Sequence, residues 1–128
     1  MRDEIRMLPA VALRGITILP GMIAHFDISR DTSIKAVERS MKDGESIFLV
    51  TQKDSNKDNP ALEDLHSMGV IAEIKQVVRL QNDIMRVMVE GQQRAEVYEI
   101  EQEQQSYLEA RVIVYIEEDE QRLPAQAE

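Results

Sequence analysis

The chain contains no cysteine and no tryptophan, and aromatic residues make up only 4% of its 128 residues. The lack of cysteine excludes disulfides, thiolate nucleophiles and cysteine-ligated zinc sites. Aliphatic side chains and seven methionines must therefore form the core, although methionine also suits an adaptable contact surface. Hydrophobic residues make up 43% of the sequence, enough for a single domain with a small core.

Basic residues are scarce as well. Fifteen lysines and arginines face 24 aspartates and glutamates, giving a net charge of −9. This balance argues against binding to nucleic acid or to an anionic membrane surface, because both need an excess of positive charge. No segment approaches the roughly 18 apolar residues that span a bilayer, and acidic residues precede the first apolar run, unlike a secretory signal. The sequence predicts a cytoplasmic protein without nucleic-acid or membrane partners.

Catalytic and ligand-binding motifs are also missing. The only histidines, His25 and His66, lie far apart and lack metal-ligand spacing. The sequence has no GxSxG elbow, no GxxxxGK[ST] phosphate loop and no GxGxxG motif. The late acidic residues do not follow the alternating pattern of a calcium loop. We therefore expect no catalytic residue, metal site or cofactor in this chain, and interpret it as a binding or scaffolding module.

Short segments typical of β-strands recur along the sequence. They are expected at residues 8–13, 22–29, 46–52, 69–80, 84–91, 94–100 and 107–117. The clearest alternation places five apolar residues on one face of the last segment: Leu108, Ala110, Val112, Val114 and Ile116. The fourth segment places another five on one face: Val70, Ala72, Ile74, Val78 and Leu80. Asn82 or Asp83 can adopt the positive φ of a tight hairpin turn after it.

One helix is predicted within residues 30–44. Asp31 and the two residues after it supply capping oxygens, and Gly44 favours a stop. Ile34, Val37 and Met41 recur at helical spacing and predict its buried stripe. The fold class is therefore mostly β with one α-helix, with six or seven largely antiparallel strands bent or closed into a small barrel.

The segment LRGITILPG, residues 13–21, is more apolar than most surface loops. Gly15 allows a turn out of the first strand, and Pro20-Gly21 a turn into the second. Between these turns, ITIL forms an apolar connection. The tail EEDEQRLPAQAE loses periodicity, so we expect a domain over residues 1–117 and an acidic tail or linker over 118–128.

Five segments in this order resemble the N-terminal domain of the Lon family of ATP-dependent proteases. They are LPAVALRGITILPGM, SIKAVERSM, IFLVTQKD, EDLHSMGVIAEIKQVVRL and VMVEGQQRAEVYEI. The resemblance implies a PUA-like pseudo-barrel with one helix after the second strand. It also implies recognition of unfolded or degron-bearing proteins, and self-association in a homo-oligomer, usually a hexamer. In that family ATP and magnesium would bind an AAA+ module, and a Ser-Lys dyad would cut the peptide bonds of the substrate. The AAA+ module and the dyad would both lie outside this chain.

On this reading the apolar connection contributes to client binding. We predict that Ile16 and Ile18 plug the barrel's end, whereas Leu19, Pro20 and Met22 form a client-binding lip. Met85 and Met88 of the predicted hairpin are further candidates for substrate contact. Two alternatives stay open: a stand-alone Lon-domain adaptor without the ATPase, and a PUA-like RNA-binding module, against which the acidic charge argues.

Overall fold

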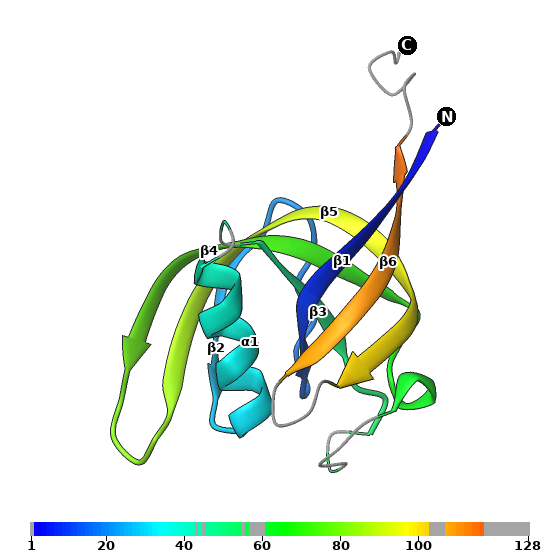
Figure 1. The fold of residues 1–128 in the computed structure, drawn as a ribbon. Helices are drawn as coiled ribbons and strands as arrows, with labels where there is room; N and C mark the ends of the chain where they lie inside the picture. Colours follow the sequence, from blue (N-terminus) through cyan, green and yellow to red (C-terminus); the bar gives the residue numbers. More distant parts are fainter. Residues whose placement is uncertain are drawn as a thin grey trace.

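The computed structural model describes residues 2–42, 44, 46–54, 56, 61–102 and 107–116, and the predicted tail 118–128 lies outside them. Six strands, one α-helix and one short 3₁₀ helix follow one another along the chain (Figure 1). They are β1 (Arg2–Leu13), β2 (Ile23–Ile28), α1 (Asp31–Lys42), β3 (Ser46–Thr51), η1 (Leu62–Asp64), β4 (Met68–Arg79), β5 (Met85–Gln102) and β6 (Leu108–Ile116). The predicted mostly β class with one helix is confirmed, and the helix follows the second strand as the family resemblance implied.

The six strands form one sheet in the order β2-β5-β4-β3-β1-β6, and an additional pairing of β5 with β6 closes it into a barrel. The long strand β5 makes this closure possible because its two halves have different partners. Its first part, up to Glu90, pairs with β2, and its last part, from Glu96, pairs with β6. All pairings are antiparallel except that of β1 with β3.

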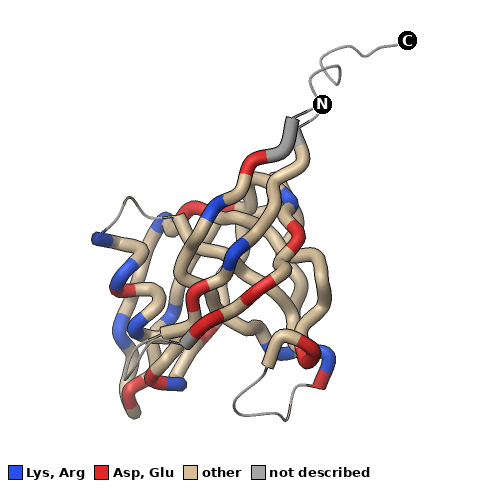
Figure 2. Tube along the Cα trace, turned by 45° about the vertical axis from the view of Figure 1, so that its right-hand side comes forward, with Lys and Arg blue, Asp and Glu red and all other residues tan. Residues whose placement is uncertain are grey.

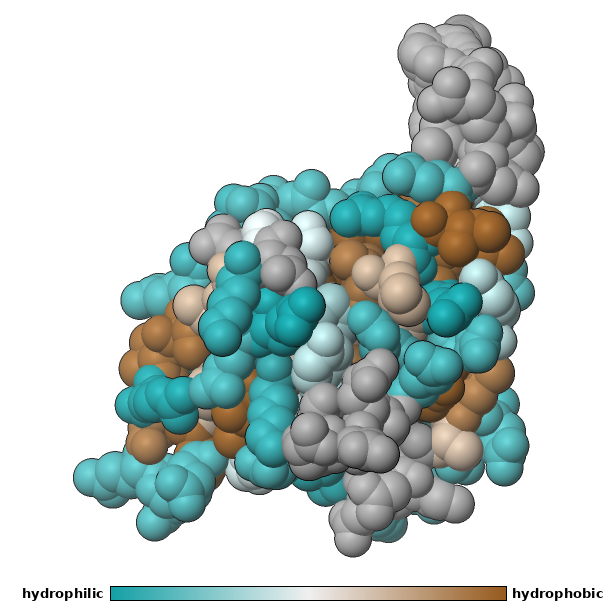
Figure 3. All heavy atoms as spheres, viewed as in Figure 1, coloured by the Kyte–Doolittle hydropathy of each residue, from teal (hydrophilic) through white to brown (hydrophobic). Residues whose placement is uncertain are grey.

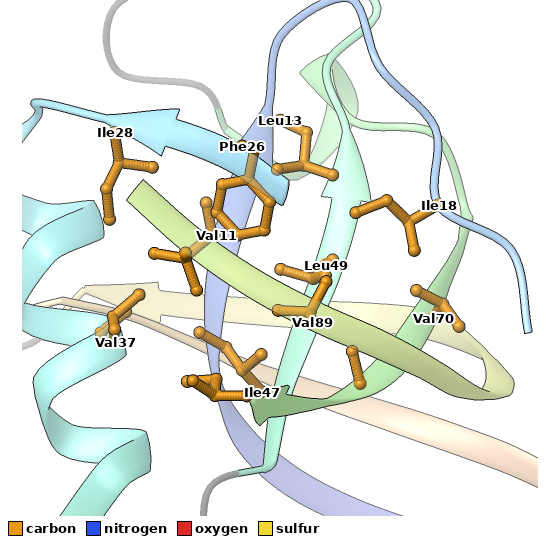
Figure 4. Packing of buried hydrophobic residues seen from close by; sticks show 14 of the residues in the cluster. Val11, Leu13, Ile18, Phe26, Ile28, Val37, Ile47, Leu49, Val70 and Val89 are labelled. Atoms are coloured by element: carbon orange, nitrogen blue, oxygen red, sulfur yellow. The ribbon is translucent and has the colours of Figure 1, made fainter. Parts of the chain in front are cut away.

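Two clusters of buried side chains fill the molecule. The first joins α1, β2 and Ile18 to β1, β3, β4 and the first half of β5 (Figure 4). The second joins β1, β3 and β6 to the second half of β5 and to Leu65. Strands β1 and β3 contribute alternate residues to both clusters, which explains the continuous apolar run of β3.

The buried face of α1 differs from the predicted stripe. Val37 is buried as expected, but Ile34 is only half-buried and Met41 is exposed. The residues buried with Val37 are small, namely Ser33, Ala36 and Ser40. The Ser40 hydroxyl donates a 2.7 Å hydrogen bond to the Ser46 carbonyl oxygen, so this buried polar group is satisfied. Small side chains allow the helix to approach the sheet closely, and a pattern of large apolar residues therefore misses this face.

The predicted inward face of β4 is right in its first half and wrong in its second. Val70, Ala72 and Ile74 are buried, whereas Val78 is exposed and Val77 packs against the core instead. A register shift in the pairing with β5, between Ile74 and Gln76, inserts one extra residue. A β-bulge of this kind reverses which residues face the core beyond it.

The hairpin turn between β4 and β5 follows the prediction. Asn82 and Asp83 both have positive φ, 63° and 60°. Backbone hydrogen bonds close the turn, with the Leu80 amide donating to the Ile84 carbonyl oxygen at 2.7 Å. Two consecutive positive φ angles match the twist of the flanking strands.

A bidentate ion pair ties β2 to β5. The Arg86 guanidinium donates to both carboxylate oxygens of Asp27, at 2.8 and 3.1 Å. This hydrogen bonding, with the attraction of the positive charge, lowers the pKa of Asp27 below its usual value. Because the folded-state pKa is depressed, the stabilisation is present at neutral pH and is lost as the pH falls through that pKa, below about 4.

We expect Asp27→Asn to lower the urea midpoint at pH 7, and the difference from wild type to shrink as the pH falls through the depressed pKa of Asp27 and the wild-type carboxylate takes up a proton. Urea unfolding of both proteins across this range measures the effect. Glu63→Gln is the matched control, because Glu63 is exposed and has no ion pair with another residue that the structure describes. A difference between Asp27→Asn and wild type that persists unchanged in acid would contradict the assignment.

Candidate substrate-contact surface

The connection between β1 and β2 divides into a buried and an exposed half. Ile18 is only 4% exposed and lies in the first core cluster near Leu49 and Val70 (Figure 4). Ile16 is half-buried against the same cluster. Leu19 and Met22 are 47% and 38% exposed. The predicted burial of Ile18 and exposure of Leu19 and Met22 are therefore confirmed.

The exposed half is a turn with a defined backbone. The Met22 amide donates to the Leu19 carbonyl oxygen at 3.0 Å, and Gly21 takes a positive φ of 81° that favours glycine. Two further bonds fasten this turn to β5: the Gly21 amide donates to the Gly91 carbonyl oxygen, and the Gly91 amide to the Met22 carbonyl oxygen, both at 2.8 Å. We call residues 19–22 the lip.

Gly91 is required for this attachment. A Cβ atom at this position would lie 2.2 Å from the Leu19 carbonyl oxygen and 3.3 Å from the Pro20 Cα. The sequence pattern placed a strand end here, but β5 runs on without a break from Met85 to Gln102. The signal that could have revealed the contact is an isolated glycine inside a strand pattern, which often marks close approach of another backbone.

A groove of about 440 Å³ lies beside the lip. Leu19 and Pro20 contribute from the connection, Leu49 and Thr51 from β3, and Met68 from the start of β4. The other lining residues are Leu13, Thr17, Ile18, Val50, His66, Ser67, Gly69 and Arg94. Among the residues that the structure describes, the lining therefore combines apolar side chains with one arginine and one histidine, and it includes no carboxylate.

The hollow lies beyond the last regular pair of β3 with β4. Their regular pairing ends at Leu49 opposite Val70. Gly69, the next residue toward the start of β4, passes so close to β3 that a Cβ atom there would lie 2.5 Å from the Leu49 carbonyl oxygen. The exposed side chain of Met68 follows. Met68 was missed from the sequence because the strand pattern gives no hint that β4 begins beside the lip.

The two methionines predicted on the hairpin have different environments. Met85 is only 2% exposed and belongs to the first core cluster with Val87 and Val89. Met85 was predicted as a candidate for substrate contact, but its side chain packs in the core, because odd-numbered residues in this part of β5 face inward. Met88 faces outward but is half-buried, beside His25 of the paired strand. Its role in substrate contact stays a prediction.

The described ranges lack two other kinds of feature, a metal-binding cluster and a membrane-spanning helix. No group of three or more histidine, aspartate or glutamate side chains there is placed to hold a metal ion. In the same part of the chain no helix has the length and apolar character needed to cross a membrane. A second hollow, of about 330 Å³, lies between the end of β1 and β2. It is lined by Arg14, Arg30, His25 and Asp27 among others, and Arg30 within it is occupied by hydrogen bonds to Ala12 and Gln52.

Comparison with known proteins gives a consistent family assignment. Residues 7–127 match the family described as the ATP-dependent protease La (LON) substrate-binding domain. A Lon protease of Clostridium acetobutylicum is 40% identical over 119 residues, covering 93% of this chain and 15% of that protein. A Lon protease of Clostridioides difficile is 47% identical over 96 residues, covering 75% of this chain and 12% of that protein. The chain thus spans a small part of the length of these relatives.

Solved structures show the same fold. The N-terminal domain of Mycobacterium avium complex Lon protease superposes with a TM-score of 0.69 at 22% identity, covering 88% of this chain and 56% of that one. A Lon N-terminal domain protein from Xanthomonas campestris gives a TM-score of 0.66 at 14% identity, covering 87% and 60%. Sequence and fold agree, and the chain belongs to the family of the Lon protease substrate-binding domain.

Proposed function

We propose that this chain recognises substrates for an ATP-dependent Lon-type protease and holds non-native protein segments at the lip and the groove beside it. The observation that carries the proposal is the exposed pair Leu19 and Met22 in one turn, of which Leu19 lines a largely apolar hollow. Unfolded proteins expose apolar side chains that native proteins bury. A surface of this kind gives such side chains a place to leave water.

The construction of the lip supports binding. Its backbone is held by hydrogen bonds to Gly91 and anchored by the buried side chain of Ile18, so little backbone order is lost when a client binds. Met22 and Met68 then provide flexible side chains that can repack against different partners. A fixed backbone with adaptable side chains suits a site that accepts many sequences.

The remaining steps would occur elsewhere in a longer protein. This sequence has no phosphate-binding loop, so ATP and magnesium would bind a different module, and the peptide bond would be cut by a Ser-Lys dyad that is also outside this chain. We further propose that the protein works in the cytoplasm as a homo-oligomer, degrading misfolded and regulatory proteins. In this arrangement the domain described here selects clients and performs no chemistry.

Crosslinking to a carboxymethylated, permanently unfolded model protein tests the proposal. We expect the double variant Leu19→Ser/Met22→Ser to capture about fivefold less of it than the wild-type chain, because two apolar contacts are removed. The matched control is Met41→Ser/Leu62→Ser, which removes two exposed apolar side chains that do not line the groove. Circular dichroism confirms that both variants are folded. Equal capture by the two double variants would contradict the role of the lip.

A further inference from the structure

The first strand has a long free edge. Residues 2–10 of β1 pair with β6 on one side, but pairing with β3 on the other side begins only at Ala10. Over residues 2–9 the second edge therefore has no strand partner in the described part of the chain. In Figure 1 this part of β1 extends from the barrel together with β6 as a two-stranded ribbon. Its amide and carbonyl groups are accessible to another strand.

Apolar side chains accompany this edge. Ile5 is 66% exposed and Met7 is 51% exposed. They lie on the outer face of the ribbon, since their neighbours Glu4 and Arg6 are opposite the buried Val114 and Val112 of β6. Figure 3 shows hydrophobic atoms at the surface where β1 and β6 extend toward the chain ends. An isolated chain leaves this apolar surface in water.

The charges along the edge match a second copy of the same strand. Residues 3–7 read Asp-Glu-Ile-Arg-Met, so acidic residues precede a basic one in the sequence. Figure 2 shows one acidic segment followed by a basic one near the start of the chain. If two copies align antiparallel with Ile5 opposite Ile5, Glu4 of each copy lies opposite Arg6 of the other. The same register places Asp3 opposite Met7. Opposite charges across strands are favourable, and like charges in that position are unfavourable.

We propose that two copies of this chain join through the free edge of β1, antiparallel and centred on Ile5. The joined ribbons form a continuous sheet in the order β6-β1-β1-β6, which pairs both free edges and brings the two Ile5 side chains together. The nearest other registers that keep the two-fold symmetry would place Glu4 opposite Glu4 or Arg6 opposite Arg6, and both are unfavourable like-charge pairs. This contact lies apart from the lip, so it holds or fails independently of the proposed client binding there.

Cysteine crosslinking tests the register, because the chain has no cysteine of its own. In this register the Cα atoms at position 5 lie about 5 Å apart, within the Cα separation that a disulfide can bridge. Those at position 7 lie about 14 Å apart along the strands. We expect Ile5→Cys to form disulfide-linked dimers at least about tenfold faster than Met7→Cys under mild oxidation. Equal rates for these two exposed positions would overturn the proposal.

Charge exchange provides a second test in the Ile5→Cys background. Adding Glu4→Arg or Arg6→Glu creates like-charge pairs on both sides of Ile5 and should slow crosslinking about tenfold. Combining both exchanges restores opposite charges and should restore the rate. Mixing the two single-exchange proteins should also yield mixed dimers. Failure of both the combined variant and the mixture to recover would overturn the pairing centred on Ile5.

Discussion

Replacing Gly91 with alanine is expected to lower the free energy of unfolding by about 3 kcal/mol. Within an ordinary strand the same exchange is favourable, because alanine restricts the unfolded chain more than glycine does. Here the new Cβ would lie 2.2 Å from the Leu19 carbonyl oxygen, and that neighbour is backbone. Relief requires the lip to move away from β5, which breaks its two 2.8 Å hydrogen bonds to Gly91. Whether Gly91→Ala lowers or raises the free energy of unfolding therefore tests the close approach of Gly91 to Leu19.

Urea unfolding followed by circular dichroism measures this change. The matched control is Gln93→Ala, which places alanine at an exposed position of the same strand. We expect its effect to stay within about 0.5 kcal/mol. Amide hydrogen exchange adds a local measurement, since Gly21 should lose protection in Gly91→Ala alone. A stabilised Gly91→Ala protein would show that the lip does not lie against β5.

Features set by nearby residues were predictable from the sequence. The alternation in β6 correctly identified the buried residues Ala110, Val112 and Val114, because a half-buried strand repeats every two residues. The turn at Asn82 and Asp83 was predictable for a similar reason, since these residue types tolerate positive φ. Each of these patterns is contained within about ten residues of chain, where local geometry decides the outcome.

Features that depend on distant contacts were not predictable in the same way. The bulge after Ile74 leaves no mark in composition, so the periodic pattern placed Val78 inward in place of Val77. Gly91 resembled a strand end because its contact with Leu19 joins residues far apart in the sequence. The groove has the same origin: it lies beyond the last regular pair of β3 with β4, and Met68 joins Leu19 only through the fold. Such pairings need the register of several strands at once.

Truncating Ile18 and truncating its neighbour Leu19 are expected to change the free energy of unfolding by very different amounts. We expect Ile18→Ala to lower the free energy of unfolding by about 3 kcal/mol, because its side chain is 4% exposed and packs in the first core cluster. Leu19→Ala should change it by less than about 0.5 kcal/mol, since a half-exposed side chain loses little on truncation. The two residues are adjacent and similar in size, so each serves as a control for the other.

Capture of the unfolded client protein should be reduced more by Leu19→Ala than by Ile18→Ala, the opposite of their order in stability. Leu19→Ala removes a contact from the lip and should weaken binding of the unfolded model protein, whereas Ile18→Ala should retain capture under conditions where it is still folded. Stability thus depends on the inward residue, and recognition on the outward one. Urea unfolding and crosslinking on the same two proteins measure both properties. Weaker capture by Ile18→Ala than by Leu19→Ala, with both folded, would place the contact in the groove interior and remove it from the lip.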